Sequence, residues 1–149
     1  MKQNDDFNNK EVQQLSETYT FNKGIPGFEH LKSFNLQQHD EIFSLFSASE
    51  ESTVAFVTVN PFDFYRDYEF ELSSECIEEL QITDQDQVLV RCIVTLHDQI
   101  QNTTANLLAP LVFNKYQHLG KQIILTNNEY KTKHTLWSDK ESQSKDGDI

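Results

Sequence analysis

The sequence predicts a single, mainly antiparallel β domain with one short helix. Short apolar and β-branched stretches, several of them alternating with polar residues, are separated by turn residues along the chain. A period of two is typical of strands that bury one face. Only one segment, near Ser74–Leu80, combines capping serines with the apolar spacing of a helix. The length of 149 residues fits one domain with a substantial core.

The stretch Thr53–Phe62, TVAFVTVNPF, carries no charge and is nearly all apolar or β-branched. Such a run is typical of a strand covered on both faces, so we expect Val54–Val59 to be buried on both sides. Pro61 has no N–H and holds the preceding Asn60 in an extended conformation, so the strand ends here. An aromatic and acidic segment, FDFYRDYEFEL, follows directly. This arrangement suggests a scaffold that presents a contact surface.

The elements before this strand follow from local signals. A strand pair is predicted within Glu11–Phe21, with the side chains of Tyr19 and Phe21 on one face. Pro26 presets φ at the second position of a turn, and Gly27 supplies the positive φ that a type II turn needs at the third. Two further short strands are predicted, at Phe34–Gln37 and Ile42–Phe46.

The helix is predicted from its cap and its apolar spacing. Ser73 or Ser74 is the expected N-cap, and Glu75 in the first turn suits the positive end of the helix dipole. Ile77 and Leu80 are expected to be buried on one side. The other side is expected to expose three glutamates to water: Glu75, Glu78 and Glu79.

The second half of the chain holds another long strand and a hairpin. Val88–Leu96, VLVRCIVTL, has alternate apolar residues on one face, whereas Arg91 interrupts the other face. The hairpin is predicted from Leu111–Gln117 and Lys121–Leu125, with Gly120 as the left-handed residue of its turn.

The C-terminal end differs from the rest in composition. Beyond Trp137 the sequence SDKESQSKDGDI is polar, and it offers no apolar residue for burial before Ile149. Such a segment is expected to be disordered. The sequence therefore predicts a β domain over residues 1–137 and a disordered polar tail over residues 138–149.

The formal charge of −12 is spread unevenly. Between Asp63 and Asp86 the chain has nine acidic residues and only one basic residue, Arg66. An acidic field repels nucleic acid, so we expect no direct binding to DNA or RNA. The acids either keep the protein in solution or attract a basic protein surface. Their interleaving with aromatic residues favours a partner site.

Composition and cysteine usage predict the compartment. Mean hydropathy of −0.60 indicates a soluble protein, and no apolar run approaches the length of a membrane span. The N-terminal MKQNDDFNNK lacks the apolar centre of a signal peptide, so we expect a cytoplasmic location without membrane association. Cys76 and Cys92 are then expected to be reduced thiols, with a disulfide as the less favoured alternative.

Residue patterns typical of catalysis or cofactor binding are missing from the sequence. The five histidines are scattered without the spacing of metal ligands, and no glycine-rich phosphate loop is present. The acidic cluster lacks the spacing and the glycine of a calcium loop. We therefore expect neither an enzyme, nor a metal site, nor a cofactor.

Four collinear stretches carry a resemblance to a known family: FNKGIPGFEHLKSF (21–34), VAFVTVNPFDFYRDYEFEL (54–72), TANLLAPLVFN (104–114) and LGKQIILTNNEYKTKH (119–134). Together they resemble the FliW family of flagellar assembly factors. The resemblance runs in order from about Phe7 to Trp137. The chain departs from the family at Asn8-Asn9-Lys10, where a glycine-containing turn is usual, and in its longer polar tail.

The resemblance implies a small, β-barrel-like domain that is not an enzyme. Members of the family bind cytoplasmic flagellin, in the manner of a chaperone. They also bind CsrA, the regulator that blocks translation of flagellin mRNA. The two partners exclude each other, so accumulated flagellin displaces CsrA. The resemblance thus predicts a role in flagellum biogenesis and translation regulation.

The expected protein-binding residues lie in and after the first long strand. CsrA binds RNA and must carry a basic surface, which an acidic protein approaches quickly. Exposed aromatic side chains within that acidic surround are candidate anchors. The predicted set is Asn60, Phe62, Phe64, Tyr65, Asp67, Tyr68, Glu69 and Glu71.

Several of these assignments have alternatives. Phe62 and Phe70 are as compatible with the core as with an interface, whereas Phe64 and Tyr65, adjacent in a turn, cannot both point inward. Asn106 is expected to cap its own loop rather than to contact a partner. For the whole protein, the competing function is a non-catalytic β-barrel module that binds a ligand in a cavity.

Overall fold

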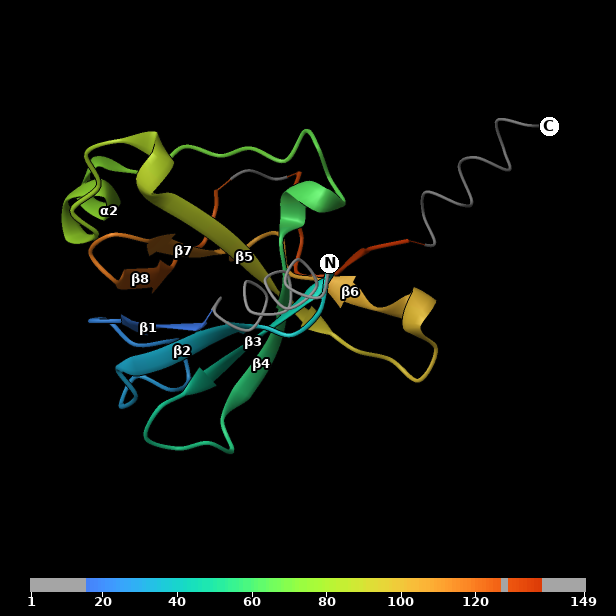
Figure 1. Ribbon diagram of the computed structural model, residues 1–149. Coiled ribbons are helices and arrows are strands. Elements are labelled where there is room, and N and C mark those ends of the chain that lie inside the picture. The colour runs from blue at the N-terminus through green and yellow to red at the C-terminus, as the bar shows by residue number, and fades with distance from the viewer. Residues whose placement is uncertain (1–15, 127–128, 138–149) are drawn as a thin grey trace, which may run out of the picture.

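The computed structural model describes residues 16–126 and 129–137. Seven strands form a barrel in the order β4-β3-β2-β1-β8-β7-β5, and pairing of β4 with β5 closes it (Figure 1). The strands are β1 (Ser16–Thr20), β2 (Ser33–Gln38), β3 (Phe43–Ala48), β4 (Ala55–Val59), β5 (Val88–Thr95), β7 (Leu111–Asn114) and β8 (Leu119–Gln122). The predicted mainly β, barrel-like fold is confirmed.

Two short strands extend the barrel beyond the end of β5. β6 (Thr104–Ala105) pairs with β5, and β9 (His134–Thr135) pairs with β6. Among the strands that the structure describes, all pairs are antiparallel except β1 and β8, which meet in parallel at Thr20 and Leu119. The prediction of antiparallel pairing therefore holds for every described strand pair except β1 with β8.

Phenylalanine rings fill the inside of the barrel. Phe21, Phe34, Phe46 and Phe113 have no exposed surface. Phe34 and Phe46 stack with ring centroids 4.6 Å apart, and Phe113 meets Phe46 edge to face at 5.8 Å. Aromatic pairs of this kind add to the free energy gained by burial. Tyr19 joins this core, so Tyr19 and Phe21 share a face as predicted.

A second apolar cluster covers the outer face of β5. It brings together the segment that follows β4 and two segments from the C-terminal part of the chain (Figure 1). Phe64 and Tyr68 come from the first segment, Leu107 and Leu136 from the others, and Cys92 from β5 itself. The outer face of β5 is therefore core rather than surface.

The expected burial of Val54–Val59 on both faces is only partly correct. Thr58 and Val59 are fully buried, but Ala55 is exposed and Phe56 and Val57 are half-buried. β4 pairs with β5 only at Thr58 and Val59. The second apolar cluster reaches this half of the strand, so only here are both faces covered.

Within the described residues, the α-helix is α2 (Ser74–Glu79), with Ser73 as its N-cap. Cys76 and Leu80 form its buried face, whereas Ile77 is 38% exposed, contrary to prediction. Residues four apart lie on one face of a helix, so Cys76 and Leu80 turn inward together and Ile77 turns away.

The prediction that Glu79 faces only water is also wrong. Its carboxylate is half-buried between Lys121 and Lys23, and the Lys23 Nζ lies 2.9 Å from Oε2. Hydrogen bonds from Lys121 and Lys23 lower the pKa of Glu79. The helix is thereby tied to β8 by Lys121 and to the turn after β1 by Lys23.

The turn at Pro26 is confirmed, because the Phe28 N–H donates to the Ile25 carbonyl at 2.6 Å and Gly27 has φ of +89°. The predicted role of Gly120 is wrong. Gly120 lies within β8, opposite Phe113, and the left-handed residue of the hairpin is His118, with φ of +58°. Glycine is needed at this position of the strand because another side chain approaches its backbone closely.

Both cysteines are buried free thiols, as predicted. The first part of the predicted strand pair within Glu11–Phe21 lies outside the described residues, which show β1 alone. The polar tail, residues 138–149, also lies outside them, so its disorder stays a prediction. No helix within the described ranges is long and apolar enough to span a membrane.

Candidate functional site

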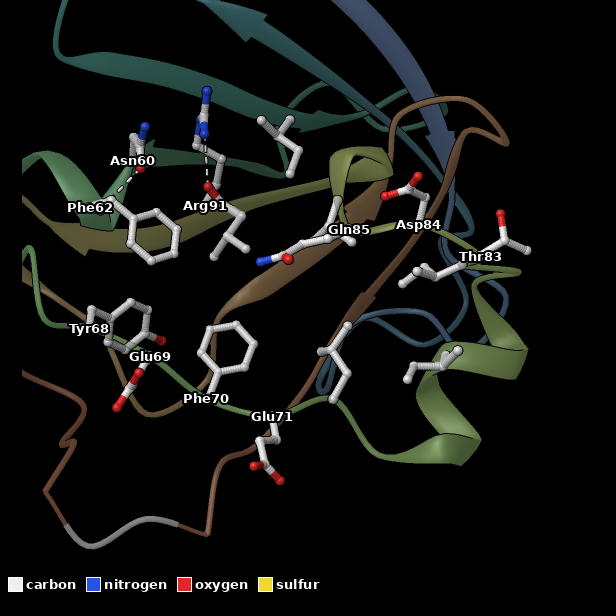
Figure 2. Close-up of a pocket in the computed structure, with 16 residues that line it drawn as sticks. Asn60, Phe62, Tyr68, Glu69, Phe70, Glu71, Thr83, Asp84, Gln85 and Arg91 are labelled. Atoms are coloured by element: carbon white, nitrogen blue, oxygen red, sulfur yellow. Dashed lines mark hydrogen bonds between the residues drawn. The ribbon is translucent and has the colours of Figure 1, made fainter.

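A groove runs beside β5, between the segment that follows β4 and the residues between α2 and β5 (Figure 2). We call it the β5 groove. Its volume is about 960 Å³. The residues that line it belong to the first half of β5, to the two segments that flank it or, for Ile77, to α2: Asn60, Phe62, Tyr68–Leu72, Ile77, Ile82–Gln85 and Val88–Arg91.

The walls of the groove are largely apolar. Phe62 is 42% exposed and meets the buried ring of Tyr68 at a centroid distance of 5.7 Å. Tyr68 in turn meets Phe70 edge to face at 5.4 Å. Val88 and Val90 of β5 and the side chain of Ile82 also line the groove. An open apolar groove with an exposed phenylalanine is typical of a surface that receives another molecule.

Three carboxylates stand at the edge of the groove. Glu69, Glu71 and Asp84 are exposed, and the side chains of Glu69 and Glu71 point away from the aromatic wall (Figure 2). None of the three has an ion-pair partner within the part of the chain that the structure describes. The rim therefore carries uncompensated negative charge, which attracts a basic surface.

Asn60 shapes the entrance of the groove through its own backbone contacts. It is the N-cap of the short 3-10 helix η1 (Pro61–Asp63), and its Oδ1 accepts a hydrogen bond from the Phe62 N–H at 3.0 Å. Pro61 at the first helical position has no N–H to satisfy. The cap fixes the turn that carries Phe62 to the surface.

Two of the predicted aromatic anchors are core residues. Phe64 is only 8% exposed and packs edge to face on Trp137 at 5.6 Å. Tyr68 is 3% exposed, and its hydroxyl donates to the Leu107 carbonyl at 2.8 Å. The expectation that they present surface aromatics is therefore wrong, because C-terminal segments cover this side of the turn.

Tyr65 is half-buried and also faces the protein, so the expectation that Phe64 and Tyr65 cannot both point inward is wrong. Its hydroxyl donates to the Thr135 carbonyl, and its ring meets that of His134 edge to face at 5.7 Å. Asp67 is exposed but lies outside the groove lining. The groove thus brings together five members of the predicted set: Asn60, Phe62, Tyr68, Glu69 and Glu71.

The sequence interpretation missed the far wall of the groove and one cation. Ile82 and Asp84, from the segment between α2 and β5, had no periodic pattern that could place them. Arg91 is half-buried, and its Nη1 donates to the Val90 carbonyl at 2.8 Å. Burial lowers the pKa of Arg91. The sequence marks Arg91 only as a charged residue within an otherwise apolar strand.

The buried thiols and phenols are poorly suited to catalysis. Burial raises the pKa of Cys92 to about 12 and raises the pKa of Tyr68 as well. A protonated thiol is a poor nucleophile. Among residues 16–126 and 129–137, no group of three His, Cys, Asp or Glu side chains could hold a metal ion.

Asn106 acts as predicted, within its own loop. Its Oδ1 accepts hydrogen bonds from the Leu108 N–H at 3.1 Å and from the Ala109 N–H at 3.0 Å. This side chain holds the turn before β7, and its contacts are local.

Comparison with known proteins identifies the family. The sequence matches the FliW protein family over residues 2–136. It is 44% identical to the flagellar assembly factor FliW of Anoxybacillus flavithermus, over 79% of this chain and 82% of that protein. It is likewise 44% identical to the protein of that name from Clostridium novyi, over 80% and 85% of the two chains.

A solved structure shows the same fold. The crystal structure of the flagellar assembly factor FliW superposes with a TM-score of 0.78 at 42% identity, covering 80% of this chain and 84% of that one. Identity at this level over most of both chains, together with the shared barrel, indicates common ancestry. The chain belongs to the FliW family of flagellar assembly factors.

Proposed function

We propose that this protein is a cytoplasmic, non-enzymatic antagonist of CsrA that alternatively binds flagellin. The observation that carries the proposal is the β5 groove, where an exposed phenylalanine, Phe62, lies inside an acidic rim whose carboxylates have no ion-pair partner among the described residues. An RNA-binding regulator must carry a basic surface, which such a rim attracts. Antagonism of CsrA relieves its repression of flagellin mRNA translation.

The alternative function, a ligand-binding barrel, receives less support. The inside of the barrel is filled by Phe21, Phe34, Phe46 and Phe113, all without exposed surface. The carboxylates of the groove stand on its rim, and do not converge within a cavity. This arrangement favours a protein surface as the partner over a small molecule.

The part of the proposal that concerns flagellin rests on membership of a flagellar assembly family. A protein that binds CsrA and flagellin in turn reports how much flagellin has accumulated. When flagellin is exported, the released protein is free to sequester CsrA again. The switch needs only that the two complexes exclude each other.

A titration tests the proposal. A complex of this protein with CsrA is formed first, and flagellin is then added while CsrA release is followed by size-exclusion chromatography with light scattering. We expect stoichiometric release of CsrA. A stable assembly of all three proteins would show that the binding is not exclusive, and absence of the starting complex would show that CsrA is not a partner. An unrelated acidic protein of similar size serves as the control.

A further inference from the structure

The pairing of β5 changes along its length. On one side, β7 pairs with it from Val88 to Arg91. On the other side, β4 pairs only with Cys92 and Ile93. The next residue of β4 in this register is Asn60, where the chain turns away into η1. The first half of β5 therefore has no neighbouring strand on this side, and its edge borders the β5 groove.

The alternation of a strand shows which backbone groups lie on this open edge. The Gln87 carbonyl accepts from the Lys115 N–H at 2.8 Å, so Gln87 faces β7. The carbonyls and N–H groups of successive residues point to opposite sides, so those of Val88 and Val90 face the groove. Edge groups of this kind form a template for another strand.

Some of these groups already have partners, and others do not. The Val88 N–H donates to the Gln85 carbonyl, and the Val90 carbonyl accepts from the guanidinium of Arg91. Among the described residues, the Val90 N–H and the Val88 carbonyl make no hydrogen bond. One donor and one acceptor, two residues apart, are thus open to an incoming backbone.

The residues around this edge indicate which side chains a bound segment should carry. On the outer face, Phe62, Phe70 and Ile82 form apolar walls. Successive side chains of an extended segment point to opposite faces, so every second side chain of a bound segment would meet these walls and should be apolar. Glu69 and Glu71 at the rim suit a lysine or arginine next to that side chain. A second copy of this acidic chain would be repelled.

We infer that the β5 groove takes an extended, basic segment of the protein partner, which adds as a strand beside Val88–Arg91. Its apolar side chain packs against Phe62, and its basic side chain pairs with Glu69 or Glu71. Backbone hydrogen bonds to Val88 and Val90 give affinity, and the side-chain contacts give specificity. The inference rests on the proposed function in one respect, since CsrA is taken as the partner that supplies the segment.

Amide hydrogen exchange on the full-length protein tests the strand addition directly. Exchange of the Val90 N–H is measured by NMR in the free protein and in the presence of saturating CsrA. We expect exchange at Val90 to slow about tenfold or more in the complex. If CsrA binds while exchange at Val90 is unchanged, strand addition is wrong and the proposed function stands. Absence of CsrA binding to the parent protein overturns both.

The free protein provides a further check. Slow exchange at Val90 before CsrA is added would show that the chain's own residues fill the edge. Slow exchange that appears only at high protein concentration would show that a second copy fills it. Either result overturns the inference.

A pair of matched variants tests the side-chain contacts. Phe62→Ser removes an exposed ring that lines the groove, and Ile100→Ser removes an exposed side chain outside it, 55% exposed. We expect Phe62→Ser to weaken CsrA binding about tenfold and Ile100→Ser to leave it nearly unchanged. Equal effects of the two variants, both shown to be folded by circular dichroism, would overturn the inference.

Discussion

Gly120 of β8 lies so close to the ring of Phe21 in the barrel core that a methyl group on Gly120 would be 2.5 Å from the Phe21 Cζ. Phe21 has no exposed surface and contacts three other core phenylalanines, so its ring has no free space into which to move. The absence of a side chain at Gly120 is therefore a packing requirement. Backbone φ is not the reason, since Gly120 is not among the residues with positive φ.

The substitution Gly120→Ala is expected to destabilise the protein by about 1–3 kcal/mol, because it overpacks a filled core. Urea unfolding followed by circular dichroism measures the change. The double variant Phe21→Leu/Gly120→Ala should lose less stability than the two single changes added together, since the smaller side chain makes room. If the losses of stability of the two single variants simply add up in the double variant, the close contact between Phe21 and Gly120 is contradicted.

Asn114 is expected to be a second point of high sensitivity. Its buried Nδ2 donates to the Leu80 carbonyl at 2.7 Å, and its Oδ1 accepts from the Tyr116 N–H at 3.0 Å. Asn114→Ala should cost at least about 2 kcal/mol, because the end of α2 and the β7–β8 turn lose buried hydrogen bonds. The exposed Asn22→Ala, as the control, should change stability by less than about 0.5 kcal/mol. Equal losses would show that Asn114 is not the link between these elements.

Stability is expected to fall at alkaline pH, in part through Cys92. Burial raises the pKa of this thiol from 9.0 to about 12. Below pH 9 the thiol is protonated in both the folded and the unfolded state, so its contribution to the free energy of unfolding is fully present. Above pH 9 the unfolded chain loses the proton while the folded chain keeps it. Each pH unit up to about 12 should therefore cost up to about 1.4 kcal/mol from this group.

The measurement compares the free energy of unfolding of the parent and of Cys92→Ala between pH 8 and pH 11. The variant has a lower stability throughout because it leaves a cavity, but its stability should fall less steeply with pH. Cys92 contacts the Tyr68 hydroxyl and contributes to the raised pKa of Tyr68, so the difference in slopes measures the Cys92–Tyr68 pair together. Identical slopes would show that Cys92 does not contribute.

The rim residues Glu69 and Glu71, together with the exposed Asp67 outside the groove lining, are expected to control how fast CsrA binds. Replacing Asp67, Glu69 and Glu71 by their amides should slow association about tenfold at low salt and flatten its salt dependence, with little change in dissociation. Stopped-flow association over a salt series measures this effect. The matched control replaces three exposed glutamates on other loops by glutamine: Glu41, Glu50 and Glu51.

Both triple variants remove the same charge, so a difference between their association rates shows that the position of the charge matters. If the variant at Asp67, Glu69 and Glu71 associates at the parent rate in low salt, these carboxylates only keep the protein in solution and do not attract CsrA. Phe62→Ala should instead speed dissociation, at a cost of about 1–3 kcal/mol in binding. Phe62 is the proper test position because Phe64 and Tyr68 are core residues, and their loss would mimic the loss of a contact.

Features that depend on neighbouring residues were predictable from the sequence. The type II turn at Pro26 and Gly27, the cap at Ser73 and the end of β4 before Pro61 are all observed. Proline, glycine and capping side chains act on φ angles and hydrogen bonds within a few residues, so their effect is independent of the rest of the fold. The acidic, aromatic segment after β4 was likewise recognisable, as was the family.

The faces of that segment were decided only by the tertiary structure. Phe62 and Phe64 are two residues apart in a turn without strand or helix periodicity, yet one is exposed and the other is buried against Trp137. The tertiary structure likewise decides why residue 120 must be glycine, since the ring of Phe21 leaves no room for a side chain there. It also leaves one edge of β5 open, because β4 turns away from it. Burial and pairing depend on which distant segments lie next to a residue, and only the folded structure brings those segments together.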